Sequence, residues 1–192
     1  LLPLPSSPSP PLPMIVLGID PGTREAGYGV ISVEGRKETA LDYGSVAMPG
    51  SMEHSLRLQV IYDKVIELAD QHLPDACAVE VPFMGKNPQS MLKLVRAQGA
   101  VMLAAMHREI PIVEYAPAEI KKSVVGKGQA AKEQVWFMVR AQLGLTEDRG
   151  LDASDALAVA LCHARRLQSG PASSGASKDW AAFIAANPGR VR

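Results

Sequence analysis

The sequence predicts an α/β fold with a mixed five-stranded sheet and helices on both of its faces. Three β-rich segments with short connections come first, which is typical of an antiparallel meander. Apolar strand-like runs then alternate with segments of helical periodicity, which indicates parallel crossovers. Only 5% of the 192 residues are aromatic and alanine is plentiful, so helices packed on a sheet are favoured over a β-sandwich.

Two of the expected strands end on a carboxylate. The apolar run that begins at Ile15 ends at Asp20 and breaks at Pro21, and the run that begins at Ala76 ends at Glu80. The second run follows a helical segment, so it is expected to lie parallel to the first, with both acids at the same edge of the sheet. The expected strands span residues 15–20, 28–33, 41–48, 76–79 and 110–115.

Helical periodicity and capping residues predict the helices. Asn87 followed by Pro88 is typical of a helix start, and Gly144 is typical of a helix end. Apolar faces that include Leu56 in the first helix and Val95 in the second are expected to pack on the core. The expected helices span residues 55–72, 88–107, 117–125, 130–143 and 152–167.

The composition excludes several classes of protein. No apolar run reaches membrane-spanning length, so no membrane partner is expected. Cys77 and Cys162 lie far apart without metal-ligand spacing, so neither a zinc site nor a disulfide is indicated, and a reducing cytoplasm is the predicted location. Residues 1–13 are rich in proline, lack a basic start and are predicted to form a disordered leader, and residues 169–192 a flexible tail.

The charges are unevenly distributed, although the formal net charge is zero. Residues 14–84 contain 5 basic and 11 acidic side chains, whereas residues 85–140 contain 9 basic and 4 acidic ones. A basic region beside an acidic one is compatible with nucleic acid held over an acidic centre. Ordinary solvated helix faces explain many of the individual lysines equally well.

Four carboxylates are the candidate catalytic residues. Asp20 and Glu80 end neighbouring strands, and Asp152 and Asp155 lie three residues apart on one face of the last helix. Taken singly, such acids also cap turns and helix starts. Four converging carboxylates stay ionised only beside cations, and oxygen ligands suit Mg²⁺ or Mn²⁺. Two such ions can activate water for attack on a phosphodiester.

Five motifs between Met14 and Leu167 resemble those of the RuvC family, the bacterial Holliday-junction resolvases of the RNase H-like superfamily. The first motif alone is shared more widely, but the ordered set is specific. The motifs are GIDPGT (18–23), GYGV (27–30), Glu80 with FMGKN (83–87), VVGKG (124–128) and DASDALA (152–158). The resemblance implies an RNase H-like nuclease domain at residues 14–168.

The resemblance also implies roles for individual residues. Asp20, Glu80, Asp152 and Asp155 match the acids that bind metal and catalyse the reaction, with two Mg²⁺ ions per site and Mn²⁺ able to substitute. Phe83 matches an aromatic residue used against bases at the junction, although simple loop packing is an alternative for it. The matching DNA-binding lysines are Lys86, Lys121 (or its neighbour Lys122) and Lys132, with Lys93 and Arg96 as weaker phosphate contacts.

The function implied by this resemblance is the metal-dependent resolution of Holliday junctions in recombination and repair. A homodimer would nick opposed strands symmetrically and leave 5′-phosphate ends, with RuvA and RuvB, the branch-migration complex, as partners. The helix at 88–107 contains Ala97, Gly99, Ala100, Ala104 and Ala105 and is the expected dimer surface, unless these residues pack on the sheet.

Three alternatives remain at this point. One is another RNase H-like nuclease, such as a YqgF-type RNA-processing enzyme. A second is an actin-like or sugar-kinase-like ATPase, which shares a Gly-x-Asp-x-Gly-Thr loop. That fold needs a second copy of the domain, and the chain is short and shows no repeat. The third is a catalytically inactive junction-binding module, which the presence of all four acids disfavours.

Overall fold

The computed structural model of the protein describes residues 12–82, 87–147 and 150–168. The predicted tail, most of the predicted leader, and the candidates Phe83 and Lys86 lie outside these residues. In chain order the elements are β1 (Met14–Asp20), β2 (Glu25–Glu34), β3 (Lys37–Ala47), α1 (His54–His72), β4 (Ala76–Glu80), α2 (Pro88–His107), β5 (Ile112–Tyr115), α3 (Pro117–Val125), α4 (Lys132–Leu143) and α5 (Leu151–Gln168).

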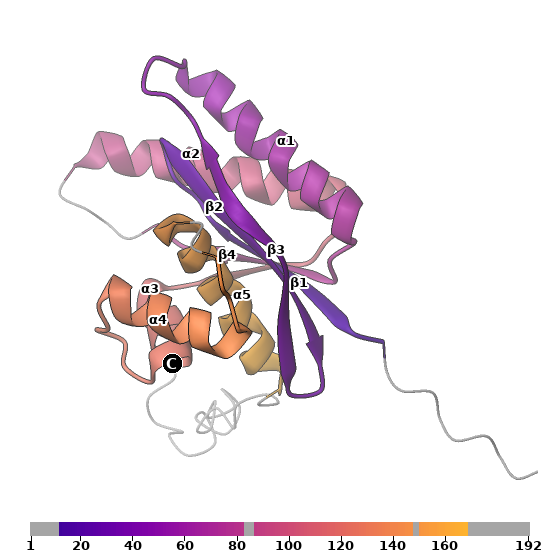
Figure 1. Cartoon of the computed structure of the whole chain (residues 1–192). Coiled ribbons are helices and arrows are strands. Elements are labelled where there is room, and N and C mark those ends of the chain that lie inside the picture. Colours follow the sequence, from indigo (N-terminus) through magenta and orange to yellow (C-terminus); the bar gives the residue numbers. More distant parts are fainter. Residues whose placement is uncertain (1–11, 83–86, 148–149, 169–192) are drawn as a thin grey trace, which may run out of the picture.

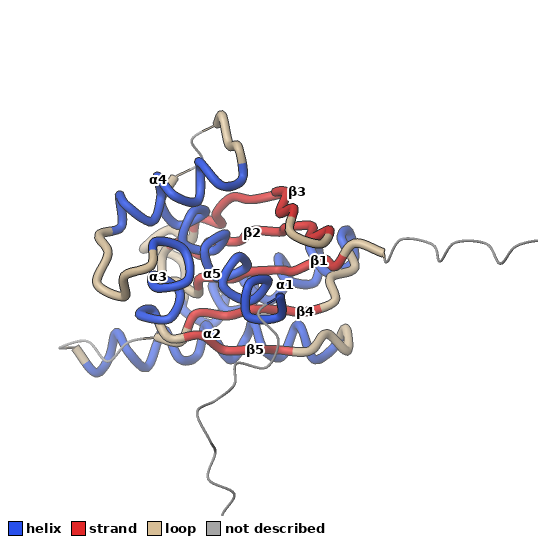
Figure 2. The backbone as a smooth tube through the Cα atoms, turned by 90° about the horizontal axis from the view of Figure 1, so that it is seen from below, coloured by secondary structure: helices blue, strands red, loops and turns tan. Residues whose placement is uncertain are grey.

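The strands form one sheet in the order β3-β2-β1-β4-β5, and Figure 2 shows them side by side. β1, β2 and β3 pair antiparallel as a meander, while β4 pairs parallel to β1 and β5 parallel to β4. Helices α1 and α2 cover one face of the sheet, and α3, α4 and α5 cover the other (Figure 1). The predicted mixed sheet with helices on both faces is therefore confirmed.

Alternate residues of each strand contribute to two separate cores, as the two-residue period of a strand requires. In β1, Val16 packs in the core beneath α5, whereas Leu17 and Ile19 pack in the core beneath α1 and α2. In β4, Ala78 faces α5, and Cys77 faces α1 and α2. Asp20 lies four residues after Val16, and Glu80 lies two residues after Ala78. The alternation therefore places both acids on the face of the sheet that α5 covers.

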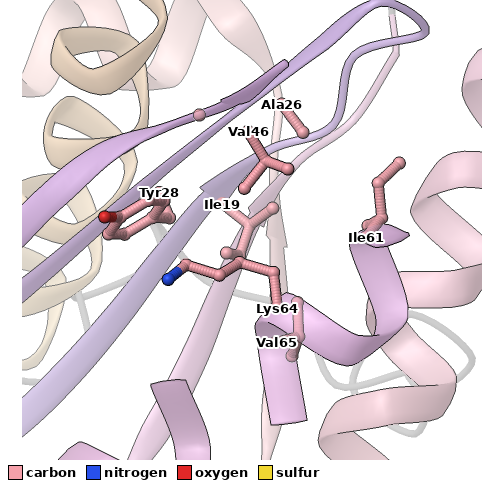
Figure 3. Close-up of a pocket in the computed structure, with 8 residues that line it drawn as sticks. Ile19, Ala26, Tyr28, Val46, Ile61, Lys64 and Val65 are labelled. Atoms are coloured by element: carbon pink, nitrogen blue, oxygen red, sulfur yellow. The ribbon is translucent and has the colours of Figure 1, made fainter. Parts of the chain in front are cut away.

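Figure 3 shows the face of the sheet under α1. The side chains of Ile19, Ala26 and Tyr28 lie here, opposite residues of α1. The Nζ atom of Lys64 lies 4.8 Å from the centroid of the Tyr28 ring, which is a cation–π contact. Both residues line the small apolar pocket between the sheet and α1. Because Ala26 and Tyr28 point toward α1, their neighbours Glu25 and Gly27 face the opposite side, toward α5.

Helix α5 lies unusually close to the sheet because glycines face it. A Cβ atom on Gly18 would stand 2.2 Å from the carbonyl oxygen of Ala156, and one on Gly27 would stand 2.0 Å from the carbonyl oxygen of Asp152. No side chain fits at these distances, so the helix backbone rests directly on the strands. This close packing determines where the first turn of α5 lies.

Several predicted boundaries differ from the structure. β3 begins at Lys37, because the hairpin turns tightly at Gly35, whose φ is 60°, and Glu34 pairs with Lys37. β2 begins at Glu25, which pairs with Ala47 at the other end of β3. β5 begins only at Ile112, two residues later than predicted. α4 begins at Lys132, because the Gln134 side chain accepts a hydrogen bond from the backbone N–H of Ala131 and caps the helix there.

The predicted apolar faces of α1 and α2 are partly wrong. Leu56 and Val95 are 51% and 44% exposed. The residues of α2 that are buried include Ala97, Ala104 and Ala105, three of the small residues expected at a dimer surface. They pack in the core that α1 and α2 share with the sheet, because small side chains let two helices lie close together on the strands.

The structure also tests two predictions from composition. Cys77 and Cys162 are both buried free thiols. Within the described ranges, no helix is both long and apolar enough to cross a membrane.

Candidate active site

Two of the predicted acids lie where β1 and β4 leave the sheet. Ile19 pairs with Val79 in the parallel register, so the next residues, Asp20 and Glu80, end adjoining strands at the same level. Both line one cleft, together with Lys121 of α3 and Lys132 of α4. The cleft continues past Pro82 toward Leu94 of α2.

Helix α5 brings the other two acids to Asp20. Asp20 lies opposite Gly27 in the antiparallel register, and Gly27 lies against the Asp152 backbone. Asp20, Asp152 and Asp155 each offer a carboxylate oxygen, and these oxygens lie within 4.8 Å of one another. Glu80 stands outside that three-residue group but shares the cleft with Asp20 and Asp155. The structure thus brings together all four acids predicted from the sequence, three of them tightly.

The charge of this cluster is not balanced by protein side chains alone. Burial, and then the negative charge of Asp155, raises the pKa of Asp20 to about 7. Burial, followed by the charges of Asp20 and Asp155, raises the pKa of Glu80 to about 8. Ionising these groups is therefore costly in the metal-free protein, and a cation that binds them would reverse the cost.

Two lysines supply positive charge beside the acids. The Nζ atom of Lys132, the first residue of α4, donates a hydrogen bond to Asp155 Oδ2 at 2.8 Å. This hydrogen bond, more than the neighbouring charges, raises the pKa of Lys132. Lys121 lines the cleft, and its charge is among the influences that lower the pKa of Glu80, whereas Lys122 is exposed and is not a lining residue. The register of α3 therefore favours Lys121 over Lys122 as the lysine of the site.

Among the described residues, the other predicted DNA contacts do not lie beside the four acids. Phe83 and Lys86 lie outside the part of the chain that the structure describes. Lys93 and Arg96 are exposed on α2, on the other face of the sheet. After burial, the charges of Arg96 and Lys93 are the next causes that lower the pKa of His54, so these side chains lie near the start of α1.

Sequence reasoning missed one acid. Glu25, the first residue of β2, carries a charge that contributes, after burial, to raising the pKa of Asp152. The two-residue repeat of a β-strand could have identified Glu25, because Glu25 and Gly27 are two residues apart and lie on the same face of β2, the face that α5 covers. It was hidden because β2 was predicted to begin only at Tyr28.

The donor set suits a hard divalent cation. All candidate ligands are carboxylate oxygens, and the described residues contribute no cysteine or histidine to the group. Oxygen-only sites of this kind select Mg²⁺ or Mn²⁺ over Zn²⁺. The half-buried carboxylates of Asp20 and Glu80 give such an ion the negative charge that the lysines leave unbalanced.

Comparison with known proteins identifies the family. The family model described as crossover junction endodeoxyribonuclease RuvC matches residues 16–163. The chain belongs to the RuvC family. The resemblance seen in the motifs is thereby confirmed. The RuvC of Salinibacter ruber is 45% identical over 181 residues, covering 93% of this chain and 99% of the relative. That of Bacteroides fragilis is 46% identical over 182 residues, covering 93% and 96%.

Solved RuvC structures share the architecture described above. Thermus thermophilus RuvC superposes with a TM-score of 0.75 at 38% identity, covering 82% of this chain and 97% of that one. A second structure, T. thermophilus RuvC in complex with a Holliday junction substrate, gives a TM-score of 0.73 at 35% identity, covering 82% and 96%. The RuvC family thus includes a member seen bound to a four-way junction.

Proposed function

We propose that this RuvC-family chain is a crossover junction endodeoxyribonuclease that resolves Holliday junctions by metal-dependent nicking of opposed strands. The observation that supports this most directly is the convergence of Asp20, Asp152 and Asp155 within 4.8 Å at one end of a cleft. Glu80, Lys121 and Lys132 line the same cleft. The cleft therefore offers carboxylates that can bind metal and lysine side chains that can contact a phosphodiester. The names of the matched relatives support the same activity.

The four acids act together as metal ligands in this proposal. Asp20, Glu80, Asp152 and Asp155 would hold two Mg²⁺ ions, with Mn²⁺ as a substitute, and such ions supply an activated water and stabilise the leaving oxygen. Lys132 neutralises Asp155 before substrate arrives, and it lies close enough to meet a phosphate in the cleft. Lys121 faces the same space from α3 and would contact the DNA backbone. No Ser, Cys or His nucleophile is required.

The enzyme acts as a homodimer in this account, since a junction with twofold symmetry is nicked at two opposed positions. The dimer surface in this proposal is the exposed apolar face of α2. Of the small residues predicted from the sequence, Gly99 lies on this face, whereas Ala97, Ala104 and Ala105 are buried. Leu92, Val95, Leu103 and Met106 are 57%, 44%, 50% and 62% exposed, at spacings that place them with Gly99 on one side of the helix. A second copy of the same helix would cover this face.

Three further proposals rest on the family alone. RuvA and RuvB, the branch-migration complex, are the expected partners at the junction, and the cytoplasm is the expected location. Phe83 and Lys86 are proposed junction contacts, on the motif at 83–87.

A cleavage assay on defined substrates tests the proposed function. The full chain is incubated with Mg²⁺ in three separate reactions, which contain a labelled four-way junction, a linear duplex of the same sequence or a single-stranded RNA. We expect paired nicks in opposed strands of the junction and little cutting of the duplex. Cutting of RNA with junctions left intact would instead support an RNA-processing nuclease.

A further inference from the structure

Arg165, near the end of α5, joins this helix to three other elements. Its Nη1 atom donates a hydrogen bond to the backbone carbonyl oxygen of Ser123 in α3 at 2.8 Å, and its Nη2 atom donates one to Gln142 Oε1 in α4 at 2.8 Å. Nε and Nη2 also donate to the two carboxylate oxygens of Glu38 in β3, at 3.3 Å and 3.0 Å. One half-buried side chain therefore ties α3, α4 and β3 to α5.

Gln142 extends this network to a second carbonyl group of α3. Its Nε2 atom donates a hydrogen bond to the backbone carbonyl oxygen of Val124 at 3.2 Å. Ser123 and Val124 belong to the last turn of α3, where carbonyl groups have no partner within the helix. Arg165 and Gln142 thus supply the hydrogen-bond donors for this end of α3, and they fix its position against α4 and α5.

Helices α4 and α5 are joined by polar contacts at two levels. At the active site, Lys132 Nζ lies 2.8 Å from Asp155 Oδ2. At the other level, Gln142 meets Arg165. The two contacts are ten residues apart on each helix, which is about 15 Å along the helix axis. Apolar packing between the helices is not directional, whereas the hydrogen bonds of a guanidinium group are, so Arg165 fixes how far α4 can slide along α5.

This arrangement matters for the cleft because the lysines and the acids come from different helices. Lys121 and Lys132 lie on α3 and α4, and Asp155 lies on α5. All three residues line the cleft, and Figure 1 shows the three helices gathered on one face of the sheet. A phosphate in the cleft must meet the acids' metal ions and the lysines at once. A shift of α3 and α4 along α5 would therefore separate the two sets of groups.

We infer that Arg165 is a positioning residue that acts through Ser123 and Gln142 to hold Lys121 and Lys132 beside the acids of the cleft. The inference rests on the proposed function and adds a residue that belongs to none of the five family motifs. Arg165 follows Asp155 by ten residues, so it acts on the cleft from about 15 Å away.

Carbodiimide coupling in the metal-free full chain tests this role without any cleavage. The reagent joins an amine to a carboxylate only where the two groups are in contact, so it reports the contact of Lys132 with Asp155, which mass spectrometry of the digested chain quantifies. Arg165→Lys keeps a cation beside Glu38 but loses the planar fork of donors, and we expect it to lower the coupling yield several-fold. Gln142→Met breaks the same link from α4 and should lower the yield as well.

Arg166→Lys is the matched control. Arg166 is the next residue of α5, is exposed, and has its guanidinium carbon 5.7 Å from the centroid of the Tyr115 ring. The control should leave both the coupling yield and junction cleavage unchanged. The melting temperature of each metal-free variant shows that it is folded.

Junction cleavage then shows whether the two lysines carry the effect. Arg165→Lys should lower the single-turnover rate by about tenfold, because the lysines no longer meet the phosphate. In a chain that already carries Lys121→Met and Lys132→Met, the same change should lower the rate by about twofold or less. A residue that only stabilises the fold would lower the rate by the same factor in both chains.

The outcomes separate this inference from the proposed function. Unchanged coupling in both Arg165→Lys and Gln142→Met would overturn the inference, whatever happens to cleavage. An equal loss of cleavage with and without the two lysines would overturn it as well. If the wild-type chain shows the coupling but cuts no junction, the proposed function fails, and the coupling yields still decide whether Arg165 positions Lys132.

Discussion

Gly27 lies directly under the first turn of α5, where a Cβ atom at its position would stand 2.0 Å from the carbonyl oxygen of Asp152. In the β1–β2 register Gly27 is also the partner of Asp20. One glycine therefore sets the distance between an acid of the sheet and the acids of the helix. The GYGV motif that begins at Gly27 thus helps to position these acids, although its Tyr28 side chain lies on the opposite face of the sheet, under α1.

Gly27→Ala is expected to push the start of α5 away from the sheet. The added methyl overlaps backbone, which cannot rotate away, so we expect destabilisation of about 1–3 kcal/mol. Displacement of Asp152 and Asp155 from Asp20 should lower junction cleavage by about a hundredfold. Urea unfolding and cleavage kinetics check both effects. Gly50→Ala is the matched control, because a Cβ there meets nothing within 4 Å, and its loss of activity would contradict the proposed cause.

Lys132→Met should have opposite effects on metal binding and on cleavage. Removing the ammonium group from Asp155 takes away a competing cation, so Mn²⁺ affinity measured by calorimetry should rise several-fold, on the order of 1 kcal/mol. Cleavage should fall by about tenfold or more, because the phosphate loses a positive partner. The neighbouring surface change Lys122→Met should alter neither. A Lys132→Met enzyme that binds metal more weakly would show that the lysine is not competing with the ion.

The stability of the metal-free protein should fall as the pH rises. Asp20 and Glu80 have pKa values of about 7 and about 8 in the folded chain, against ordinary values of 3.8 and 4.5, because burial disfavours their charged forms. At a pH between the ordinary pKa and the folded-state pKa of each acid, the folded state binds more protons than the unfolded state. The stability present at low pH is therefore lost as the pH rises toward 8. Urea unfolding in EDTA measures the slope, which Asp20→Asn should flatten.

Added Mg²⁺ provides the control for this pH dependence. The ion binds the ionised acids of the folded state, so its stabilising effect should be larger at pH 8 than at pH 6. A metal-free protein whose stability rises steadily from pH 5 to pH 8 would show that other groups dominate.

Leu103→Glu should convert the proposed dimer into monomers. Leu103 is 50% exposed on the apolar face of α2, and a carboxylate there would be buried without a partner in a dimer. Sedimentation velocity measures the change, and the melting temperature of the monomer should stay close to that of wild type. Leu41→Glu is the control. It replaces a leucine of β3 that is 48% exposed and lies away from α2, and it should leave the dimer intact. A monomeric wild-type chain would remove the dimer from the account.

Local patterns were sufficient to predict most of the fold. The apolar runs that end at Asp20 and Glu80 identified two parallel strands, and Asn87 with Pro88 identified the start of α2, where the Asn87 side chain accepts hydrogen bonds from Gln89 and Ser90. The four acids were found because strand ends and a helix start are positions that local chemistry specifies.

Contacts between distant elements could not be predicted in the same way. Whether Ala97 faces the core or a partner depends on how α1 and α2 cross, which helical periodicity does not determine. The contact of Glu25 with Asp152 depends on the register between β2 and α5, and the strand start was placed too late to show it. The sequence gives no reason for the glycines at positions 18 and 27, and only the packed helix explains them.

The most direct test of the central claim measures binding and cleavage of one labelled four-way junction by Asp20→Asn. This variant keeps the shape of the side chain and removes a metal-binding charge, so junction affinity in Ca²⁺ or EDTA should match that of wild type. Cleavage in Mg²⁺ should fall by about a thousandfold or more, because the carboxylate cluster can no longer hold its ions. Near-normal cleavage by Asp20→Asn would contradict the account, since Asp20 would then lie outside the catalytic centre.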